Sequence, residues 1–167
     1  ALKELLSEIG IDVDVRPQKG QLLSFKTDFD TKDWPVLFLE GAADIIPFQE
    51  GEILIGATHE NEKGWDLSES EAAFFDLTEG IKPYFSESKL IEFPYHYRVG
   101  TRAYSADFSP FFGPHPAFSS LAFASALGSS GLTTGPYIAY LLAQYFNHPE
   151  TKWDYSIYQK DINTYLK

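Results

Sequence analysis

The sequence has no cysteine and no methionine among its 167 residues, and it is poor in basic side chains. The missing cysteine excludes disulfides, thiolate metal sites and cysteine nucleophiles, and it is typical of a cytoplasmic protein. Lys and Arg number 13 against 24 Asp and Glu, which gives a net charge of −11. Clustered basic residues bind nucleic acids and anionic membrane surfaces, so this balance disfavours both as partners. No run reaches the roughly 18 apolar residues of a membrane span, so no transmembrane segment is expected.

The missing methionine bears on where the chain begins. It starts at Ala1, already inside an amphipathic pattern. Removal of an initiator before a small residue would explain this start, and so would a chain cut from a longer protein. The length predicts one domain, or one and a part. With 44% hydrophobic residues the chain can bury a sizeable core.

The apolar patterning indicates short strands mixed with a few helices. Two apolar runs, 43–48 and 52–58, flank Gln49-Glu50-Gly51 and predict a hairpin. A helix is expected after Ser68, which fits a capping box with Glu71. Further strands are expected at 11–15, 21–25, 90–104 and 121–126, with turns at 17–20 and 110–116, a helix from Pro136 and a last helix at about 155–166. The fold class is therefore α+β, a mainly antiparallel sheet with helices on one face.

The only strand-to-helix passage with the character of a binding loop is residues 128–136, Gly-Ser-Ser-Gly-Leu-Thr-Thr-Gly-Pro. Small residues there let backbone N–H groups approach an anion or a flat ring, and the helix adds its positive end. No Lys follows the glycines, which excludes a Walker phosphate loop, and the glycines do not frame a serine as a nucleophile elbow does. A tight structural turn explains the passage equally well.

Few other residues suggest chemistry. Arg102, in the aromatic segment 90–104, is either an amphipathic surface residue or a clamp for a carboxylate or phosphate. None of the four His residues has zinc-site spacing, so no metal is expected. Asp44 is interpreted as a carboxylate, buried or at a sheet edge, whose hydrogen bonds are satisfied. With no triad or carboxylate pair recognisable, an enzyme of this sequence would depend on a cofactor.

The segment around Arg102 resembles a family motif. Gly100, Arg102, Ser105, Asp107, Pro110 and Gly113 fit the pattern G-x-R-x-x-[ST]-x-D-x-x-P-x-x-G of the D-amino-acid oxidase family of FAD-dependent oxidoreductases, which includes glycine oxidase. Three more segments resemble that family in the same order. They are Pro17 to Gln21, which fits Pro-x-[Arg/Lys]-Gly-Gln, the hairpin at 44–58, and the strand, loop and helix that cover 121–146.

The resemblance implies a domain layout. Family members open with a G-x-G-x-x-G segment that binds FAD, and this sequence has no such segment, so it resembles the C-terminal half of a member whose N-terminal FAD-binding half is missing. The layout implied is a return segment from the FAD domain at 1–16, a substrate (cap) domain at 17–98, the C-terminal part of the FAD domain at 99–150, and a C-terminal helix at 151–167.

The resemblance also implies an activity. The parent protein would oxidise the C–N bond of a small amino acid or secondary amine by hydride transfer to FAD, and this chain alone would be inactive. The alternative is a non-catalytic cap-type domain that binds a ligand or a partner.

Site residues follow from the resemblance position by position. Arg102 matches the clamp for the substrate carboxylate. Asp44 and His59 stand where glycine oxidase has a substrate-facing Tyr and an active-site Met, which makes a polar or cationic amine conceivable. The loop near the flavin matches Leu127, Gly128, Ser129, Ser130, Gly131, Leu132 and Thr133. Ser129 replaces a loop Arg of glycine oxidase, so no second cation for the carboxylate is evident.

Overall fold

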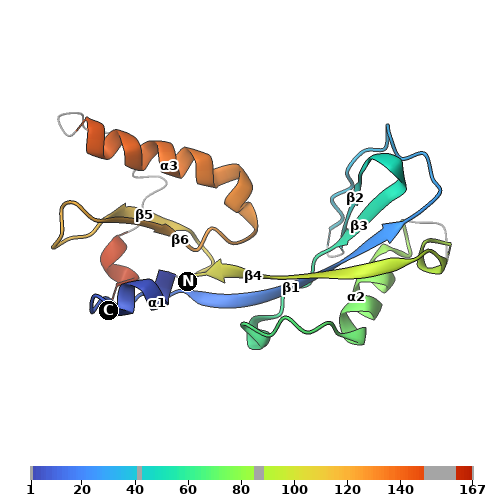
Figure 1. Ribbon diagram of the computed structural model, residues 1–167, viewed down its shortest axis with the longest axis horizontal. Helices are drawn as coiled ribbons and strands as arrows, with labels where there is room; N and C mark the ends of the chain where they lie inside the picture. The colour runs from blue at the N-terminus through green and yellow to red at the C-terminus, as the bar shows by residue number, and fades with distance from the viewer. Residues whose placement is uncertain (1, 41–42, 85–88, 149–160, 167) are drawn as a thin grey trace. The chain divides into compact units, whose positions relative to one another are not determined.

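The computed structural model describes residues 2–40, 43–84, 89–148 and 161–166, and the chain divides into two compact units. One unit combines residues 1–17 with 102–167, and the other holds residues 18–101. The chain passes from the first unit into the second within strand β1 (Arg16–Lys26) and returns within β4 (Tyr95–Tyr104) (Figure 1). Among the described residues, no helix is long and apolar enough to cross a membrane.

The 18–101 unit is built on a four-stranded sheet in the order β2-β3-β1-β4. Strands β2 (Asp44–Pro47) and β3 (Glu52–Gly56) form the expected antiparallel hairpin, and β3 also pairs antiparallel with β1. The hairpin turn requires left-handed backbone at Glu50 (φ 62°) and Gly51 (φ 76°). A Cβ on Gly51 would lie 2.3 Å from the carbonyl oxygen of Thr27, so only glycine fits there. Pro47 ends the edge strand β2, as its missing N–H favours.

Strand β1 corrects the expectation of a turn at 17–20. It runs without a break through Pro17 and Gly20. Lys19, a charged residue inside the predicted turn, is only 1% exposed, and Gln21, at the start of the predicted strand 21–25, is 0% exposed. The backbone N–H and C=O of Lys19 both pair with Glu60, at 3.2 and 2.9 Å. These long-range partners keep the segment extended, and they are invisible to local sequence patterns.

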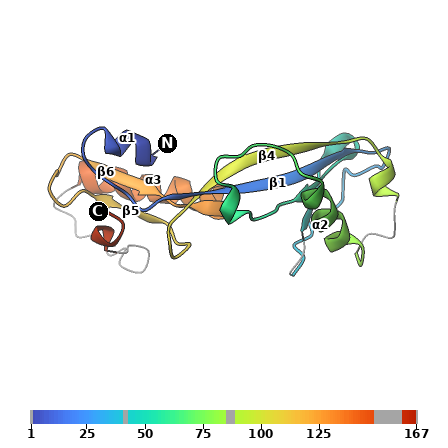
Figure 2. The same ribbon diagram turned by 90° about the horizontal axis from the view of Figure 1, so that it is seen from below.

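Helix α2 (Glu71–Ile81) covers one face of the sheet (Figure 2). Period-two alternation places the buried side chains of the strands on that face. They form a core with the helix that consists of Leu23, Phe25, Ile45, Ile53, Ile55, Leu77, Ile81 and Leu90. The register Leu22↔Gly56↔Asp44 puts Asp44 on the opposite face.

The other unit contains helices α1 (Leu2–Ser7) and α3 (Gly131–Asn147) and an antiparallel pair, β5 (Phe111–Pro114) with β6 (Ala122–Ser125). Helix α3 packs on this pair through Ile138 and Leu141 against Phe112 (Figure 1). A second cluster, which includes Leu6, Val13, Phe111, Phe123 and Tyr165, forms the rest of the core.

Two local expectations for this unit were wrong, and a third falls partly outside the described residues. Residues 111–114 form β5 in place of a turn, because they pair with the buried strand at 122–125. The expected strand at 11–15 is a single bridge between Val13 and Leu166. Of the expected last helix, residues 155–160 lie outside the described residues, and Ile162–Thr164 forms one 3₁₀ turn.

Helix α3 begins five residues earlier than the sequence indicates. Gly128–Ser130 is a 3₁₀ turn that continues directly into α3, so Pro136 lies inside the helix and not at its first position. The hydroxyls of Thr133 and Thr134 both donate to the carbonyl oxygen of Ser130 at 2.9 Å. These bonds satisfy both hydroxyls within the first turn, so the Gly- and Thr-rich composition does not exclude helical form.

Candidate functional site

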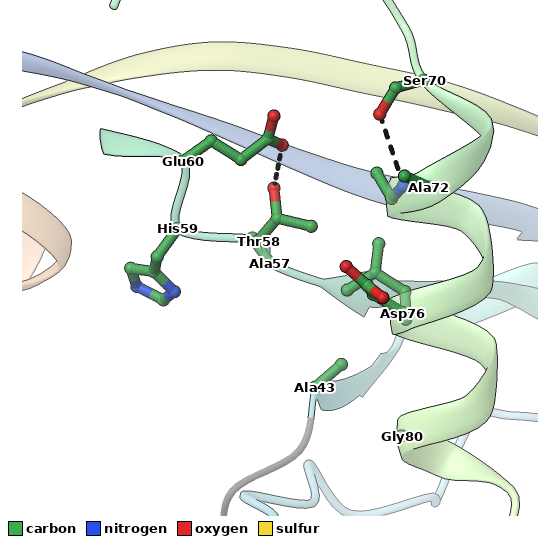
Figure 3. A pocket seen from close by; sticks show the side chains of 11 residues that line it. Ala43, Ala57, Thr58, His59, Glu60, Ser70, Ala72, Asp76 and Gly80 are labelled. Atoms are coloured by element: carbon green, nitrogen blue, oxygen red, sulfur yellow. Dashed lines mark hydrogen bonds between the residues drawn. The ribbon is translucent and has the colours of Figure 1, made fainter. Parts of the chain in front are cut away.

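The 18–101 unit contains a cavity of about 630 Å³ between α2 and the segment that follows β3 (Figure 3). Its walls are mostly small side chains with a few polar ones. The lining residues are Ala43, Ala57, Thr58, His59, Glu60, Ser70, Ala72, Ala73, Asp76, Leu77 and Gly80. Among the described residues the lining includes two carboxylates and one imidazole but no Lys or Arg, so the cavity suits a small ligand that is polar or positively charged.

Glu60 is fixed in the wall by hydrogen bonds to one of its oxygens. Thr58 Oγ1 donates to Glu60 Oε1 at 2.6 Å, and the Gln21 amide donates to the same oxygen at 2.8 Å. Partial burial raises the pKa of Glu60, but these two hydrogen bonds and the charges of Lys19 and Lys63 outweigh burial and leave the pKa below its ordinary value. Glu60 therefore presents a carboxylate at neutral pH.

The first turn of α2 forms another part of the wall, and its cap differs from the expected one. The N-cap is Ser70, whose Oγ accepts from Ala73 N at 3.3 Å, so the proposed capping box of Ser68 and Glu71 is wrong. The Gln21 amide explains the choice, because it donates to Ser70 Oγ at 2.9 Å and accepts from Ser70 N at 3.1 Å. A partner 49 residues away selects the cap, and the local motif carries no signal of it.

The structure brings His59 into this cavity but not Asp44. His59 comes from the segment after β3, together with Thr58 and Glu60, while Asp76 projects from α2 (Figure 3). Asp44 opens β2 opposite Gly56, and its Oδ1 lies 3.4 Å from the Leu39 amide nitrogen that donates to it. Its neighbour Ala43 contributes to the cavity instead.

Arg102 and residues 127–133 belong to the other unit. Arg102 is half-buried near the end of β4. Alternation along β4 puts Arg98 and Arg102 on the same side of the strand. Arg98 Nη2 forms a 2.6 Å ion pair with Glu52 Oε1.

Residues 127–130 are anchored by Tyr104. Gly128 has φ 55°, and a Cβ there would lie 2.3 Å from Tyr104 Cε1. The Ser129 N–H donates to Tyr104 Oη at 3.1 Å, and Ser129 Oγ lies 2.8 Å from the same oxygen. The backbone of this turn thus lies directly against an aromatic ring, and Leu132, in the first turn of α3, is 96% exposed.

The composition around this turn fits a neutral, planar ring system such as a flavin. From Phe108 to Pro149 the sequence has no Asp, Glu, Lys or Arg, although the whole chain carries a net charge of −11. Helix α3 has no acidic side chain in its first turn. Negative charge that develops on a ring held there would meet the positive end of α3, whose first turn carries no carboxylate.

Sequence patterns do not identify five residues of these two places as candidates: Gln21, Glu60, Ser70, Asp76 and Tyr104. Gln21 lies in the Pro-x-Lys-Gly-Gln segment, which carries the family resemblance but no sign of a site, and the others carry no local signal. Within the described segments, no group of three or more His, Asp or Glu side chains is arranged to hold a metal ion.

Comparison with known proteins identifies the family. The model of the DAO family, described as FAD dependent oxidoreductase, matches residues 2–145. The chain is 34% identical over 160 residues to the uncharacterized oxidoreductase YurR of Bacillus subtilis, and 31% identical over 140 residues to the glycine oxidase of Pseudomonas aeruginosa. These matches cover 93% and 84% of the chain but only 42% and 37% of the relatives, so the chain spans about two fifths of their length.

Solved structures agree with this assignment. The iminodiacetate oxidase of Chelativorans sp. BNC1 matches with a TM-score of 0.82 and 25% identity, over 93% of this chain and 42% of that one. The glycine oxidase of Geobacillus kaustophilus shares the fold with a TM-score of 0.75 and 19% identity, over 92% of this chain and 40% of that one. The chain therefore belongs to the DAO family of FAD-dependent oxidoreductases.

Proposed function

We propose that this chain is the C-terminal part of an FAD-dependent oxidoreductase that oxidises the C–N bond of a small amino acid or secondary amine. Relatives named glycine oxidase and iminodiacetate oxidase support this choice. The two named substrates share one feature, an amine nitrogen on a methylene that bears a carboxylate. We take an N-substituted glycine as the substrate class.

We assign the 18–101 unit to the substrate domain and the unit that contains α3 to the FAD domain. The unmatched part of the relatives, more than half of their length, would supply the ADP-binding segment. The chain alone would then bind FAD weakly and turn over no amine.

Arg102 is proposed as the clamp for the substrate carboxylate. A guanidinium offers two parallel N–H donors that match the two carboxylate oxygens. Such a clamp fixes the carbon next to the carboxylate, and with it the direction of the C–H bond that breaks. Sequence motif and family membership support the role.

Residues 127–133 are proposed to contact the flavin. Bound FAD would supply the acceptor for the hydride of the carbon next to the nitrogen, and the imine product would hydrolyse in water. The backbone at Gly128 can approach a flat ring because no Cβ intervenes. The N-terminal end of α3 would stabilise negative charge on the reduced ring.

The cavity beside His59 is proposed to hold the part of the amine that does not react. Ionised Glu60 and the Asp76 carboxylate favour a positively charged or hydrogen-bond-donating group there, and His59 can donate or accept a hydrogen bond. Asp44, on the opposite sheet face, is proposed to contact the substrate separately. Four alanines and a glycine among the lining residues limit the apolar contacts that a long side chain would need.

One observation carries the proposal. Residues 108–149, which include Gly128 and α3, have no Asp, Glu, Lys or Arg although the chain is acidic, and most of them lie inside the segment that matches the family. Its test is a substrate panel on the full-length protein with a dye as electron acceptor. We expect turnover of N-methylglycine and iminodiacetate, and none of amines in which a carboxamide replaces the carboxylate. Equal turnover of the acid and amide forms would contradict the proposed substrate class.

A further inference from the structure

We propose that Gln21 and Lys19, two buried residues of β1, are positioning residues that hold the His59 wall of the cavity in place. This inference rests on the proposed function of that cavity. Neither residue lines the cavity itself. They act through the segment that carries Thr58, His59 and Glu60 and through the first turn of α2.

Gln21 uses its whole side-chain amide on wall residues. Its Nε2 donates to Glu60 Oε1 at 2.8 Å and to Ser70 Oγ at 2.9 Å, and its Oε1 accepts from Ser70 N at 3.1 Å. Its backbone N–H donates to Thr58 Oγ1, and its carbonyl accepts from Thr58 N, both at 2.9 Å. One fully buried residue thus joins two cavity walls, the His59 segment and α2.

Lys19 fixes the other side of the same segment. Its Nζ donates to the carbonyl oxygen of Ser68 at 2.5 Å and lies 3.7 Å from Asp66 Oδ2. Its backbone pairs with Glu60 in both directions. The loop from 60 to 70 is therefore held at both ends by β1, and it has little freedom to move away from the cavity.

The two residues bracket His59. Thr58 is hydrogen-bonded to Gln21. Glu60 is hydrogen-bonded to both Gln21 and Lys19. Both neighbours of His59 are therefore fixed to strand β1. Burying an amide and an ammonium group costs free energy that an apolar core residue would not require. The next two residues of that face, Leu23 and Phe25, show that β1 packs on α2 with apolar side chains. The polar pair therefore serves the geometry of the wall, since packing does not need it.

Three variants test the inference in the full-length protein. Gln21→Leu should raise KM roughly tenfold and leave kcat within about twofold, because the wall is misplaced and the reacting groups are not. Gln18→Leu is the matched control, since Gln18 is a 3% exposed glutamine of the same strand that bonds Asn61, outside the cavity. It should leave KM unchanged. Gln21→Glu gives a signature that a general loss of stability would not produce.

In Gln21→Glu, a protonated carboxyl can still donate to Glu60 and accept from Ser70 N, whereas two ionised carboxylates would repel each other. The charged and titratable groups around Glu60 are Lys19 of β1, Lys63 of the loop, Asp76 of α2 and neighbouring His59. KM should therefore be near the wild-type value at acid pH and rise as pH increases, while the wild type shows no such rise.

A second measurement does not depend on turnover. In proton–carbon NMR spectra of this chain, the His59 ring signals should shift in Gln21→Leu and stay in place in Gln18→Leu. An unshifted His59 in Gln21→Leu, or equal shifts in both variants, would overturn the positioning role. If His59 shifts as expected but the full-length protein oxidises no amine, the positioning role stands and the proposed function fails.

Discussion

Gly128 lies so close to Tyr104 that a Cβ on it would be 2.3 Å from the ring. The left-handed φ of 55° adds a second reason for glycine. We predict that Gly128→Ala lowers the free energy of unfolding by about 2 kcal/mol, from backbone strain and displacement of the ring. Urea denaturation of the chain measures this.

Gly131 provides the matched control for that variant. It is helical, and a Cβ there would meet Leu127 Cβ at an ordinary 3.6 Å. Gly131→Ala should therefore be neutral or stabilise by up to about 1 kcal/mol. Equal destabilisation by both substitutions would contradict the tight packing of Gly128 on Tyr104.

The cap of α2 gives a second prediction. Ser70→Ala should lower the free energy of unfolding by about 1 kcal/mol or more, because Ala73 N loses its acceptor and the Gln21 amide loses a partner. Ser68→Ala, at the position that the sequence motif favours, should change stability by less than about 0.5 kcal/mol. A larger loss at Ser68 would restore the capping box that the structure rejects.

Arg102 is tested against a neighbouring arginine of the same strand. In the full-length protein, Arg102→Lys should raise KM for carboxylate-bearing amines roughly tenfold or more, because a lysine cannot form the bidentate contact. Arg98, which is paired with Glu52, lies on the same side of β4, and Arg98→Lys should leave KM unaltered. Steady-state kinetics that show no change in either variant would remove Arg102 from the site.

Glu60 makes stability depend on pH in a defined direction. Its pKa in the folded protein is below the ordinary 4.5, so as pH falls the unfolded chain takes up the proton first. The stabilisation by Glu60 is therefore full above that value and is lost as pH falls through the folded pKa.

Comparison of the wild type with Glu60→Gln measures this effect. The difference in unfolding free energy should be greatest at neutral pH and shrink below about pH 4.5. A difference for Glu60→Gln that stays constant from neutral to acid pH would refute the stabilising hydrogen bonds.

The sequence was sufficient where the signals are local. Residues 44–56 contain parts of two apolar runs on either side of a glycine turn, and they form the predicted hairpin. The helix over residues 71–81 shows its apolar spacing clearly, although its cap was misplaced. The motif around Arg102 and three further segments in the same order predict the family, which the match to residues 2–145 confirms.

Sequence patterns failed where distant partners decide. Lys19 lies in an extended strand, where local patterns predict a turn, because Glu60 and Ser68 satisfy its polar groups. The burial of Gln21 depends in the same way on Glu60 and Ser70, and no local rule contains that information. The cavity was missed for the same reason, since its walls come from two segments joined by those bonds. The roles of Arg102, Asp44, His59 and residues 127–133 stay predictions.

Anaerobic reduction of the flavin in the full-length protein tests the central claim most directly, because it reads hydride transfer without oxygen or dye. The protein would be mixed with N-methylglycine, and the visible flavin absorbance followed. We predict that the wild-type protein loses its visible flavin absorbance at saturating substrate. The Arg102→Lys variant should need roughly tenfold more substrate to lose half of that absorbance. A protein that binds FAD but keeps its absorbance with every carboxylate-bearing amine would contradict the account.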